Sequence, residues 1–258
     1  MISFPTQTLT SIDYVVELLC KAKHAVVLTG AGISTPSGIP DFRSEGTGLW
    51  SRDEPMEVAS LSTFRTDPER FFVWFRPLAN LIVNAKPNLA HIALANLEKA
   101  KRIHSIITQN IDALHQKAGS KNVIETHGTC RTLSCTQCFH QAEAEDYLKA
   151  FVVQGKLPHC SKCGSLMKPN VILFGEQLPQ QAWYDAQRES RQCDLMLVAG
   201  SSLEVLPVAG LPMQAIDRGA HLVIMNNSVT YINVRADVVI KEDVADVLPV
   251  IAEQVLHG

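Results

Sequence analysis

The chain has 258 residues, 46% of them hydrophobic, and its 23 Lys and Arg against 26 Asp and Glu give a formal net charge of -3. This length and apolar content leave room for one large domain and a small insert. The near-even charge balance excludes an overall basic footprint, so a nucleic-acid partner is not indicated.

The cysteines and the N-terminal residues predict the compartment. The first thirty residues contain Asp13 and Glu17 and lack an export signal, and no later apolar run approaches eighteen residues. Four of the seven cysteines form two Cys-x-x-Cys pairs, which in a reducing compartment favours metal over disulfides. We therefore expect a cytoplasmic protein with no membrane segment, and we favour a monomer.

A helix and a buried strand are the first predicted elements. Residues 11–22 place apolar side chains at helical spacing, and Ala25–Leu28 is an apolar run bounded by glycine, as in a buried strand of a parallel sheet. Gly30, Ala31 and Gly32 then let the backbone turn with no side chain between its N–H groups and an anion. Such a turn is how a strand-to-helix connection holds a pyrophosphate.

The turn departs from the usual dinucleotide fingerprint, because Thr35 occupies the place of its third glycine. Pro36 and Pro40 disfavour a long helix, so we expect a loop. The loop leads to Asp41, Phe42 and Arg43. Their acid, aromatic face and guanidinium suit a ribose, a flat ring and a phosphate. The alternative is a tight turn with a surface salt bridge.

Residues 44–66 are polar and irregular, which predicts a mobile loop over the site. A helix follows from Asp67-Pro68, and Pro77 is expected to kink or break it. Its dense aromatic face is interpreted as core packing of a small helical module. Pro87 fits the first position of another helix, which runs to Ala100. The residues expected to face inward from it are Leu89, Ile92, Ala93 and Leu97.

Polar side chains follow the next two predicted strands. Strand 103–108 leads to Gln109, Asn110 and Asp112, which offer the donors and acceptors that ribose hydroxyls and a carboxamide require. Helix capping by Asn110 or Asp112 is the alternative. Strand 122–125 leads to His127, which is placed for general-base work, although a lone histidine is more often structural.

Residues 129–168 form a separate unit around two Cys-x-x-Cys pairs. The pairs have the spacing of a four-thiolate zinc site, in which no position is left for water. We predict one structural zinc; two redox pairs or disulfides are the competing interpretation. A short helix is expected over residues 144–153. The four predicted ligands are Cys135, Cys138, Cys160 and Cys163.

Two later strands also end in polar residues. Strand 195–199 is followed by Gly200, Ser201 and Ser202, and strand 221–225 by Asn226, Asn227 and Ser228. Because ligands of open α/β sheets bind at the carboxyl ends of the strands, these ends indicate one extended nucleotide crevice.

The ordered motifs resemble the sirtuin family of NAD-dependent protein deacylases, in its compact, prokaryotic-type catalytic core. They are Gly-Ala-Gly-Ile-Ser, Ile-Pro-Asp-Phe-Arg, Thr-Gln-Asn-Ile-Asp-x-Leu-His, His-Gly, the two Cys-x-x-Cys pairs, Phe-Gly-Glu, Gly-Ser-Ser-Leu-x-Val and a late Asn-Asn-Ser. The resemblance extends from about residue 15 to about residue 250.

The resemblance implies an α/β fold with a Rossmann-type parallel sheet and helices on both faces. A small domain would consist of a zinc ribbon and a helical module. The NAD-binding domain would comprise residues 1–43, 85–128 and 168–258, and the small domain residues 44–84 (helical module) and 129–167 (zinc-binding module).

The resemblance also implies roles for individual residues. His127 would be the catalytic base, with Asn110 and Asp112 as further catalytic residues. The NAD-binding set would be Gly30, Ala31, Gly32, Ile39, Asp41, Phe42, Arg43, Gln109, Asn110, Ile111, Asp112, Gly200, Ser201, Ser202, Asn226, Asn227, Ser228 and Val244. The substrate peptide would contact Val171, Phe174, Gly175, Glu176 and Val205.

The implied reaction is NAD-dependent removal of acetyl and other uncharged short acyl groups from protein lysines, which yields nicotinamide, O-acyl-ADP-ribose and free lysine. The acyl-lysine protein would bind as an extended strand in the interdomain cleft. Succinyl-preferring relatives carry a tyrosine and, three residues later, an arginine, whereas this chain has Phe75 with no arginine three residues on and Arg76 pointing elsewhere. Mono-ADP-ribosyl transfer and a non-catalytic NAD-sensing module are the alternatives.

Overall fold

The computed structural model describes residues 4–42, 48 and 54–258. The predicted role of Arg43, and most of the loop predicted between residues 44 and 53, lie outside the described residues.

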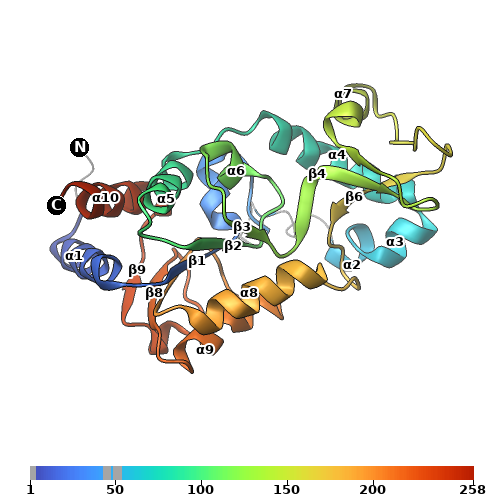
Figure 1. The fold of residues 1–258 in the computed structure, drawn as a ribbon. Helices are drawn as coiled ribbons and strands as arrows, with labels where there is room; N and C mark the ends of the chain where they lie inside the picture. The colour runs from blue at the N-terminus through green and yellow to red at the C-terminus, as the bar shows by residue number, and fades with distance from the viewer. Residues whose placement is uncertain (1–3, 43–47, 49–53) are drawn as a thin grey trace.

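A six-stranded parallel sheet forms the centre of the larger part of the molecule (Figure 1). Its order is β3-β2-β1-β7-β8-β9, and every neighbouring pair is parallel. The strands are β1 (Ala25–Thr29), β2 (Ser105–Thr108), β3 (Val123–Glu125), β7 (Leu195–Ala199), β8 (His221–Met225) and β9 (Val238–Ile240). Five of the six were predicted from their apolar runs, and β9 was not.

Helices cover both faces of this sheet (Figure 1). One face packs in a single apolar cluster with α1, α5 and α10, and the other packs with α8 and α9. The helices of this part are α1 (Thr6–Lys21), α5 (Leu89–Lys99), α6 (Leu114–Ala118), α8 (Gln180–Gln192), α9 (Leu211–Ile216) and α10 (Val244–His257). The 3-10 segments are η1 (Ala31–Ser37), η3 (Val208–Gly210) and η4 (Asn233–Arg235). The predicted α/β class with helices on both faces is therefore confirmed.

Two expectations for these helices need correction. η1 occupies the stretch predicted to be a loop, and a 3-10 segment of this length accommodates Pro36 where a longer α-helix would not. The inward face of α5 was predicted correctly for Ala93 and Leu97, which are buried. It was predicted wrongly for Leu89 and Ile92, which are 59% and 42% exposed, while Ala90 and Leu94 are fully buried.

The helical module also differs from the prediction. Residues 54–66 contain α2 (Pro55–Val58) and α3 (Leu61–Thr66), so the predicted loop is wrong there. α4 runs from Pro68 to Asn84 through Pro77 without ending. The aromatic face buries side chains on both sides of the proline in one cluster, which offsets the hydrogen bond that Pro77 cannot make.

A second, three-stranded sheet of order β5-β4-β6 carries the cysteine pairs. It consists of β4 (Gly128–Cys135), β5 (Gln141–Glu143) and β6 (Met167–Val171), all antiparallel. α7 (Glu145–Gln154) confirms the short helix expected between the pairs. Figure 1 shows this sheet and α7 beside α3 and α4, away from α1 and α10.

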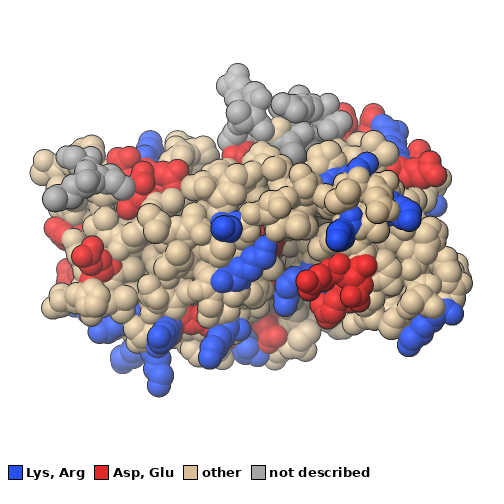
Figure 2. Space-filling model, turned by 90° about the horizontal axis from the view of Figure 1, so that it is seen from above, with Lys and Arg blue, Asp and Glu red and all other residues tan. Residues whose placement is uncertain are grey.

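The surface shows no single charged region on the face drawn in Figure 2, where basic and acidic side chains are interspersed. Among the described residues, no helix combines the length and apolar character needed to cross a bilayer.

Candidate active site

The carboxyl ends of four strands meet at one edge of the large sheet. Thr29, the last residue of β1, pairs with Thr108 of β2 and with Ala199 of β7, and Ala199 pairs with Met225 of β8. The polar residues that follow these strands therefore converge, as their positions in the sequence predicted.

The glycine turn after β1 is packed against the chain that follows β7. The N–H of Gly32 donates to the carbonyl of Gly200 at 2.8 Å, and the N–H of Gly30 donates to Ala199 at 3.3 Å. A Cβ on Gly32 would lie 2.8 Å from that carbonyl, and one on Gly200, whose φ is +62°, would lie 2.3 Å from the nitrogen of Ile33. The sequence suggested that Gly30 and Gly32 keep their N–H groups open to an anion. That reason is wrong, because both N–H groups are hydrogen-bonded within the protein. The missing side chains instead allow the turn after β1 to touch the backbone after β7.

Ser34 connects the two polar residues that follow β2. The hydroxyl of Ser34 donates to Oδ2 of Asp112 at 2.7 Å and lies 3.1 Å from Nδ2 of Asn110, which also donates to the carbonyl of Gly30. The N–H of Leu114 donates to the other oxygen of Asp112 at 2.8 Å. Burial raises the pKa of Asp112. Sequence reasoning did not single out Ser34; its place two residues after Gly32 was the available signal.

His127 follows β3 and faces the same site. Its Nδ1 lies 3.1 Å from the carbonyl of Gln109, so the neutral ring donates Nδ1–H and leaves Nε2 as an acceptor. Burial lowers the pKa of His127, which keeps the imidazole neutral near pH 7. An uncharged imidazole with a free acceptor nitrogen is the form that a general base requires.

A cavity of about 740 Å³ brings most of the predicted site residues together. Those that line it are Ala31, Ile39, Phe42, Gln109, Asn110, Ile111, Asp112, His127, Val171, Phe174, Gly175, Glu176 and Val205. Phe75, which the resemblance places at the acyl group, also lines it, and the remaining wall includes residues that were not predicted for the site, among them Ser34, Pro40, Phe71, Trp74, Leu78 and Trp183. The aromatic face of α4 therefore serves the cavity as well as the core.

The other predicted NAD-binding residues that the structure describes lie outside the lining of this cavity. Gly30, Gly32, Gly200, Ser201 and Ser202 surround the glycine contact, and Ser201 accepts a 2.9 Å hydrogen bond from the amide of Gln109. Asn226, Asn227 and Ser228 follow β8, and the amide of Asn226 donates to both Ser228 oxygens. Asp41 precedes Phe42 and is half-buried, whereas the side chain of Val244 is 4% exposed and packs in the core.

The segment predicted to contact the substrate peptide is hydrogen-bonded to the helical module. Phe174 donates its N–H to Ala59 and accepts from Leu61, each at 2.9 Å, in an isolated parallel bridge. The carboxylate of Glu176 accepts from the N–H of Leu173 at 2.8 Å and pairs with Lys168 at 2.9 Å. The backbone amide and carbonyl of Phe174 are therefore occupied, and a peptide strand would have to pair with Gly175 or its neighbours.

A buried imidazole pair lies beneath the strand ends. The rings of His91 and His115 have centroids 4.9 Å apart, and Nε2 of His115 contacts the hydroxyl of Thr29 at 3.0 Å. Nε2 of His91 and Nδ1 of His115 have no protein partner. Burial lowers the pKa of His91 to about 4 and that of His115 to about 3.

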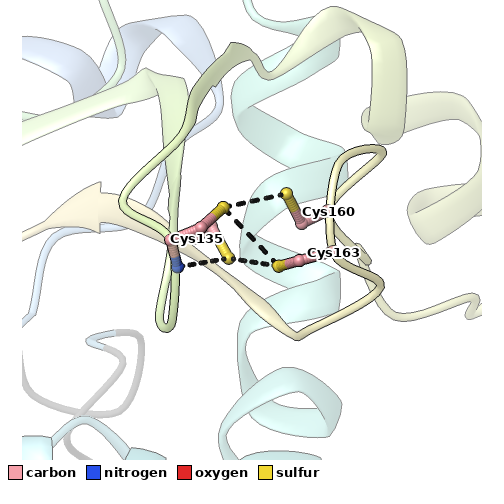
Figure 3. A group of neighbouring side chains, drawn as sticks. Cys135, Cys160 and Cys163 are labelled. Carbon is pink, nitrogen blue, oxygen red and sulfur yellow. Dashed lines mark hydrogen bonds between the residues drawn. The ribbon is translucent and has the colours of Figure 1, made fainter.

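Figure 3 shows the cysteine cluster at the tip of the small sheet. The Sγ–Sγ distances are 3.4 Å between Cys135 and Cys163, 3.5 Å between Cys138 and Cys163, and 3.7 Å between Cys138 and Cys160. Four sulfurs at about 2.3 Å from a tetrahedral zinc would lie roughly 3.8 Å apart, so the cluster fits one ion and the spacing excludes disulfides. Backbone N–H groups of residues 137, 138 and 162 point at the sulfurs. The predicted structural zinc site is confirmed in its geometry.

Comparison with known proteins gives one consistent result. Residues 30–207 match the family model described as the Sir2 family. The chain is 45% identical over 240 residues to NAD-dependent protein deacylase 2 of Archaeoglobus fulgidus, covering 93% of this chain and 94% of the relative. It is 42% identical over 249 residues to the NAD-dependent protein deacetylase of Sulfurisphaera tokodaii, covering 95% and 98%.

A solved structure described as Sir2 with a p53 peptide and NAD+ has a TM-score of 0.86 and 40% identity, over 94% of this chain and 98% of its own. The match to the family model and the high identity over nearly the whole of each relative show that the chain belongs to the Sir2 family.

Proposed function

We propose that this protein removes acetyl and other uncharged short acyl groups from lysine side chains of proteins in an NAD-dependent reaction that yields nicotinamide, O-acyl-ADP-ribose and free lysine. The relatives are named NAD-dependent protein deacylase and deacetylase. The observation that carries the proposal is the position of His127 in the same cavity as Asn110 and Asp112.

When bound, NAD supplies the ribose carbon that nicotinamide leaves and the acyl oxygen joins. The protein must hold these two groups in line, because a weak nucleophile reacts only when it is well oriented. Asn110, Ser34 and Asp112 provide that orientation on the ribose and carboxamide side. Their mutual hydrogen bonds hold the three side chains in a single arrangement before the substrates enter. Ala31, Ile39, Asp41, Phe42 and Arg43 would complete the pyrophosphate and nicotinamide side.

His127 would take a proton from a ribose hydroxyl, so that this oxygen could attack the acyl carbon; with the addition of one water molecule the lysine amine would leave and the acyl group would remain on the ribose. The carbonyl of Gln109 keeps the ring in the tautomer with Nε2 unprotonated. Gly200, Ser201, Ser202, Asn226, Asn227, Ser228 and Val244 are proposed for the adenosine side. The four thiolates hold zinc and take no part in the chemistry.

The acyl-lysine substrate would enter as an extended strand along Val171, Gly175, Glu176 and Val205. All four line the cavity. Because Phe174 already pairs with Ala59 and Leu61, we assign it to side-chain contact and not to main-chain pairing. Main-chain recognition carries little sequence preference, so many protein substrates are compatible.

The cavity wall favours an uncharged acyl group. Phe75 and Leu78 line it, whereas Arg76 directs its guanidinium to the carbonyls of Val152 and Val153, each at 2.9 Å. None of the described residues that line the cavity is a lysine or arginine, so a succinyl carboxylate would find no cationic partner among them. An uncompensated buried charge costs about 3–5 kcal/mol, or at least about 100-fold in kcat/KM. The ratio of kcat/KM on matched acetyl and succinyl peptides tests this preference. Leu78→Arg should lower the ratio, and Arg76→Gln should leave it unchanged. Equal rates on both peptides would contradict the assignment.

We propose that the molecule has two domains, with boundaries at residues 1–43, 85–128 and 168–258 against 44–84 and 129–167. The apolar clusters on the two faces of the large sheet contain no residue of the small domain, and the cluster around the cysteines contains none of the large domain, which supports the division. The pairing of β6 with β4 favours moving the last boundary to the end of Val171. The substrate cleft would lie between the two. We also propose a monomer that works in the cytoplasm, where cysteines remain reduced; sedimentation and cell fractionation test these two statements.

One experiment tests the function directly. The purified protein is incubated with NAD and an acetyl-lysine peptide, and the products are weighed by mass spectrometry. Free lysine peptide, nicotinamide and O-acetyl-ADP-ribose in equal amounts are expected. ADP-ribose attached to protein with no O-acetyl-ADP-ribose would instead identify a mono-ADP-ribosyl transferase.

A further inference from the structure

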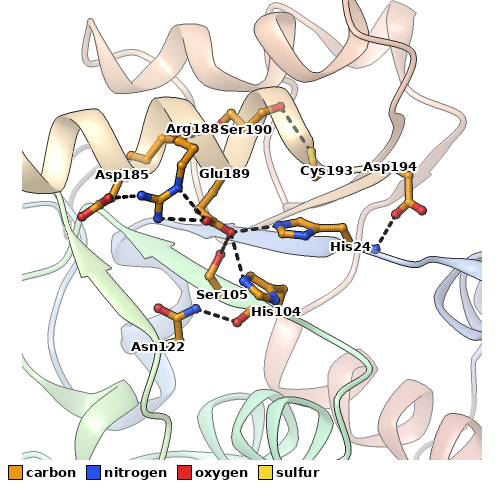
Figure 4. A network of polar contacts seen from close by, with 11 residues as sticks. His24, His104, Ser105, Asn122, Asp185, Arg188, Glu189, Ser190, Cys193 and Asp194 are labelled. Atoms are coloured by element: carbon orange, nitrogen blue, oxygen red, sulfur yellow. Dashed lines mark hydrogen bonds and ion pairs between the residues drawn. The ribbon is translucent and has the colours of Figure 1, made fainter.

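Two imidazoles and one carboxylate meet at the edge of the large sheet opposite the active site. His24 and His104 immediately precede β1 and β2, so they lie at the amino ends of the strands, and Glu189 reaches them from α8 (Figure 4). Nε2 of His24 lies 2.9 Å and Nε2 of His104 lies 3.7 Å from the same oxygen, Oε2 of Glu189. No step of the proposed reaction uses these residues.

The three side chains have the composition of a transition-metal site. Among the described residues, only this group and the four cysteines bring three or more potential ligand atoms within 4.8 Å of one another. Ligand atoms at about 2.0–2.1 Å from a tetrahedral zinc lie roughly 3.4 Å from one another. The observed distances from the two Nε2 atoms to the carboxylate oxygen therefore need to change by about half an ångström at most. Two imidazoles and a carboxylate are one of the sets that hold zinc with an open position.

The surroundings hold these ligands in place. The N–H of His24 donates to Asp194 at 2.9 Å, and the N–H of His104 donates to the carbonyl of Ala25 at 2.8 Å, so both histidines have a fixed backbone. The two rings lie side by side with centroids 4.1 Å apart and planes tilted by 32°. Partners outside the ligand set are what usually orient metal-binding side chains.

The carboxylate of Glu189 is also oriented and keeps its charge. The hydroxyl of Ser105 donates to Oε2 at 3.0 Å and the guanidinium of Arg188 donates to Oε1. Arg188 is in turn paired with Asp185 at 2.7 Å, so its positive charge is balanced by a second carboxylate. The side chain of Glu189 is 4% exposed, whereas that of His104 is 54% exposed, which gives an ion access from solvent.

We propose that His24, His104 and Glu189 form a binding site for a divalent transition-metal ion of the zinc type, separate from the four-cysteine site. In the absence of the ion, the ring of His24 donates Nε2–H to Glu189, while Nε2 of His104 faces the same oxygen from beyond hydrogen-bond distance. On binding, that proton moves to Nδ1 or to solvent, and the Nε2 lone pair faces the metal. A water molecule takes the open position. The bound ion joins the loops before β1 and β2 to α8, the helix whose residues Gln180 and Trp183 line the active-site cavity.

Equilibrium dialysis of the full-length protein against micromolar Zn2+, followed by metal analysis, tests the site. Wild type should hold two equivalents, and His104→Gln, a change at an exposed side chain, should hold one. His221→Gln is the matched control, because His221 is an exposed imidazole 3.1 Å from Asp237 without a third ligand; it should keep two.

A second measurement identifies the ligands. Co2+ added to protein that carries one equivalent of Zn2+, in the four-cysteine site, should give the visible bands of a nitrogen and oxygen site, with no sulfur charge-transfer band, and His104→Gln should abolish them. Added Zn2+ should raise the melting temperature of wild type and of His221→Gln but not of His104→Gln. One equivalent of zinc in wild type, or two in His104→Gln, overturns the proposal.

Discussion

The buried pair His91 and His115 makes the stability of the fold sensitive to acid. An exposed imidazole has a pKa near 6.5, whereas burial holds the pKa of His91 at about 4 and that of His115 at about 3. Because the folded-state pKa values are depressed, the unfolded chain binds protons first as the pH falls below 6.5. Stability is therefore complete above that pH and declines until the folded-state values are reached.

The size of the effect follows from these values. Between pH 7 and pH 5 the unfolded state becomes protonated while both native rings remain neutral, so each histidine removes about 2 kcal/mol from the free energy of unfolding. The pair together should remove about 4 kcal/mol, a large part of the stability of an ordinary domain.

Urea unfolding at pH 7 and pH 5 measures this loss, and single variants isolate each ring. His115→Gln keeps a polar atom near the hydroxyl of Thr29, and His91→Asn keeps an acceptor for the N–H of Asn88. Between pH 7 and pH 5, the free energy of unfolding of each variant should fall by about 2 kcal/mol less than that of wild type, whatever the stability of the variant at pH 7. A loss equal to that of wild type in both variants would refute the reasoning.

Four further predictions concern the site and the zinc. His127→Ala should lower kcat by roughly 10²- to 10⁴-fold and leave NAD affinity nearly unchanged, as measured by single-turnover kinetics and calorimetry; undiminished turnover would exclude it as the base. Because burial lowers the pKa of His127, the acid limb of the rate profile should fall below pH 6.5, and a limb centred above that value would contradict this assignment. Ser34→Ala leaves Asp112 and Asn110 each without one hydrogen-bond partner. The free energy of unfolding should therefore fall by about 1–3 kcal/mol, and kcat should fall as well. Thr35→Ala, at an exposed neighbouring residue, should change neither quantity. Zinc removal by a chelator, or Cys160→Ser, should lower melting temperature and activity together; full stability without zinc would contradict a structural role.

The sequence predicted those parts of the fold that depend on local pattern. β1, β7 and β8 are short apolar runs because both faces of a parallel sheet are covered, and this pattern is visible without the structure. The zinc site is likewise predictable, since the spacing within each pair determines which sulfurs can meet. The polar residues after the strands were predicted because each follows an apolar run directly in the sequence, and parallel strands bring their carboxyl ends to the same edge of the sheet.

Other features depend on tertiary packing and could not be predicted. α5 is apolar almost all round, so its sequence did not distinguish the exposed Leu89 from the buried Leu94. Pro77 lies in mid-helix because aromatic packing on both sides outweighs its local cost. The bridge between Ser60 and Phe174 joins distant segments with no shared pattern, so this backbone contact between the helical module and the chain after β6 became visible only in the structure.

The pairing of β1 with β7 has a consequence for how the chain is made. Ala25 is opposite Leu195, so the strand that leads into the active site lacks one of its two neighbours until most of the protein has left the ribosome. Until then the nascent chain exposes an apolar strand edge, which is prone to pair with other chains. Contacts this distant along the chain also slow folding. We therefore expect truncation before β7 to yield aggregating fragments instead of a smaller working enzyme.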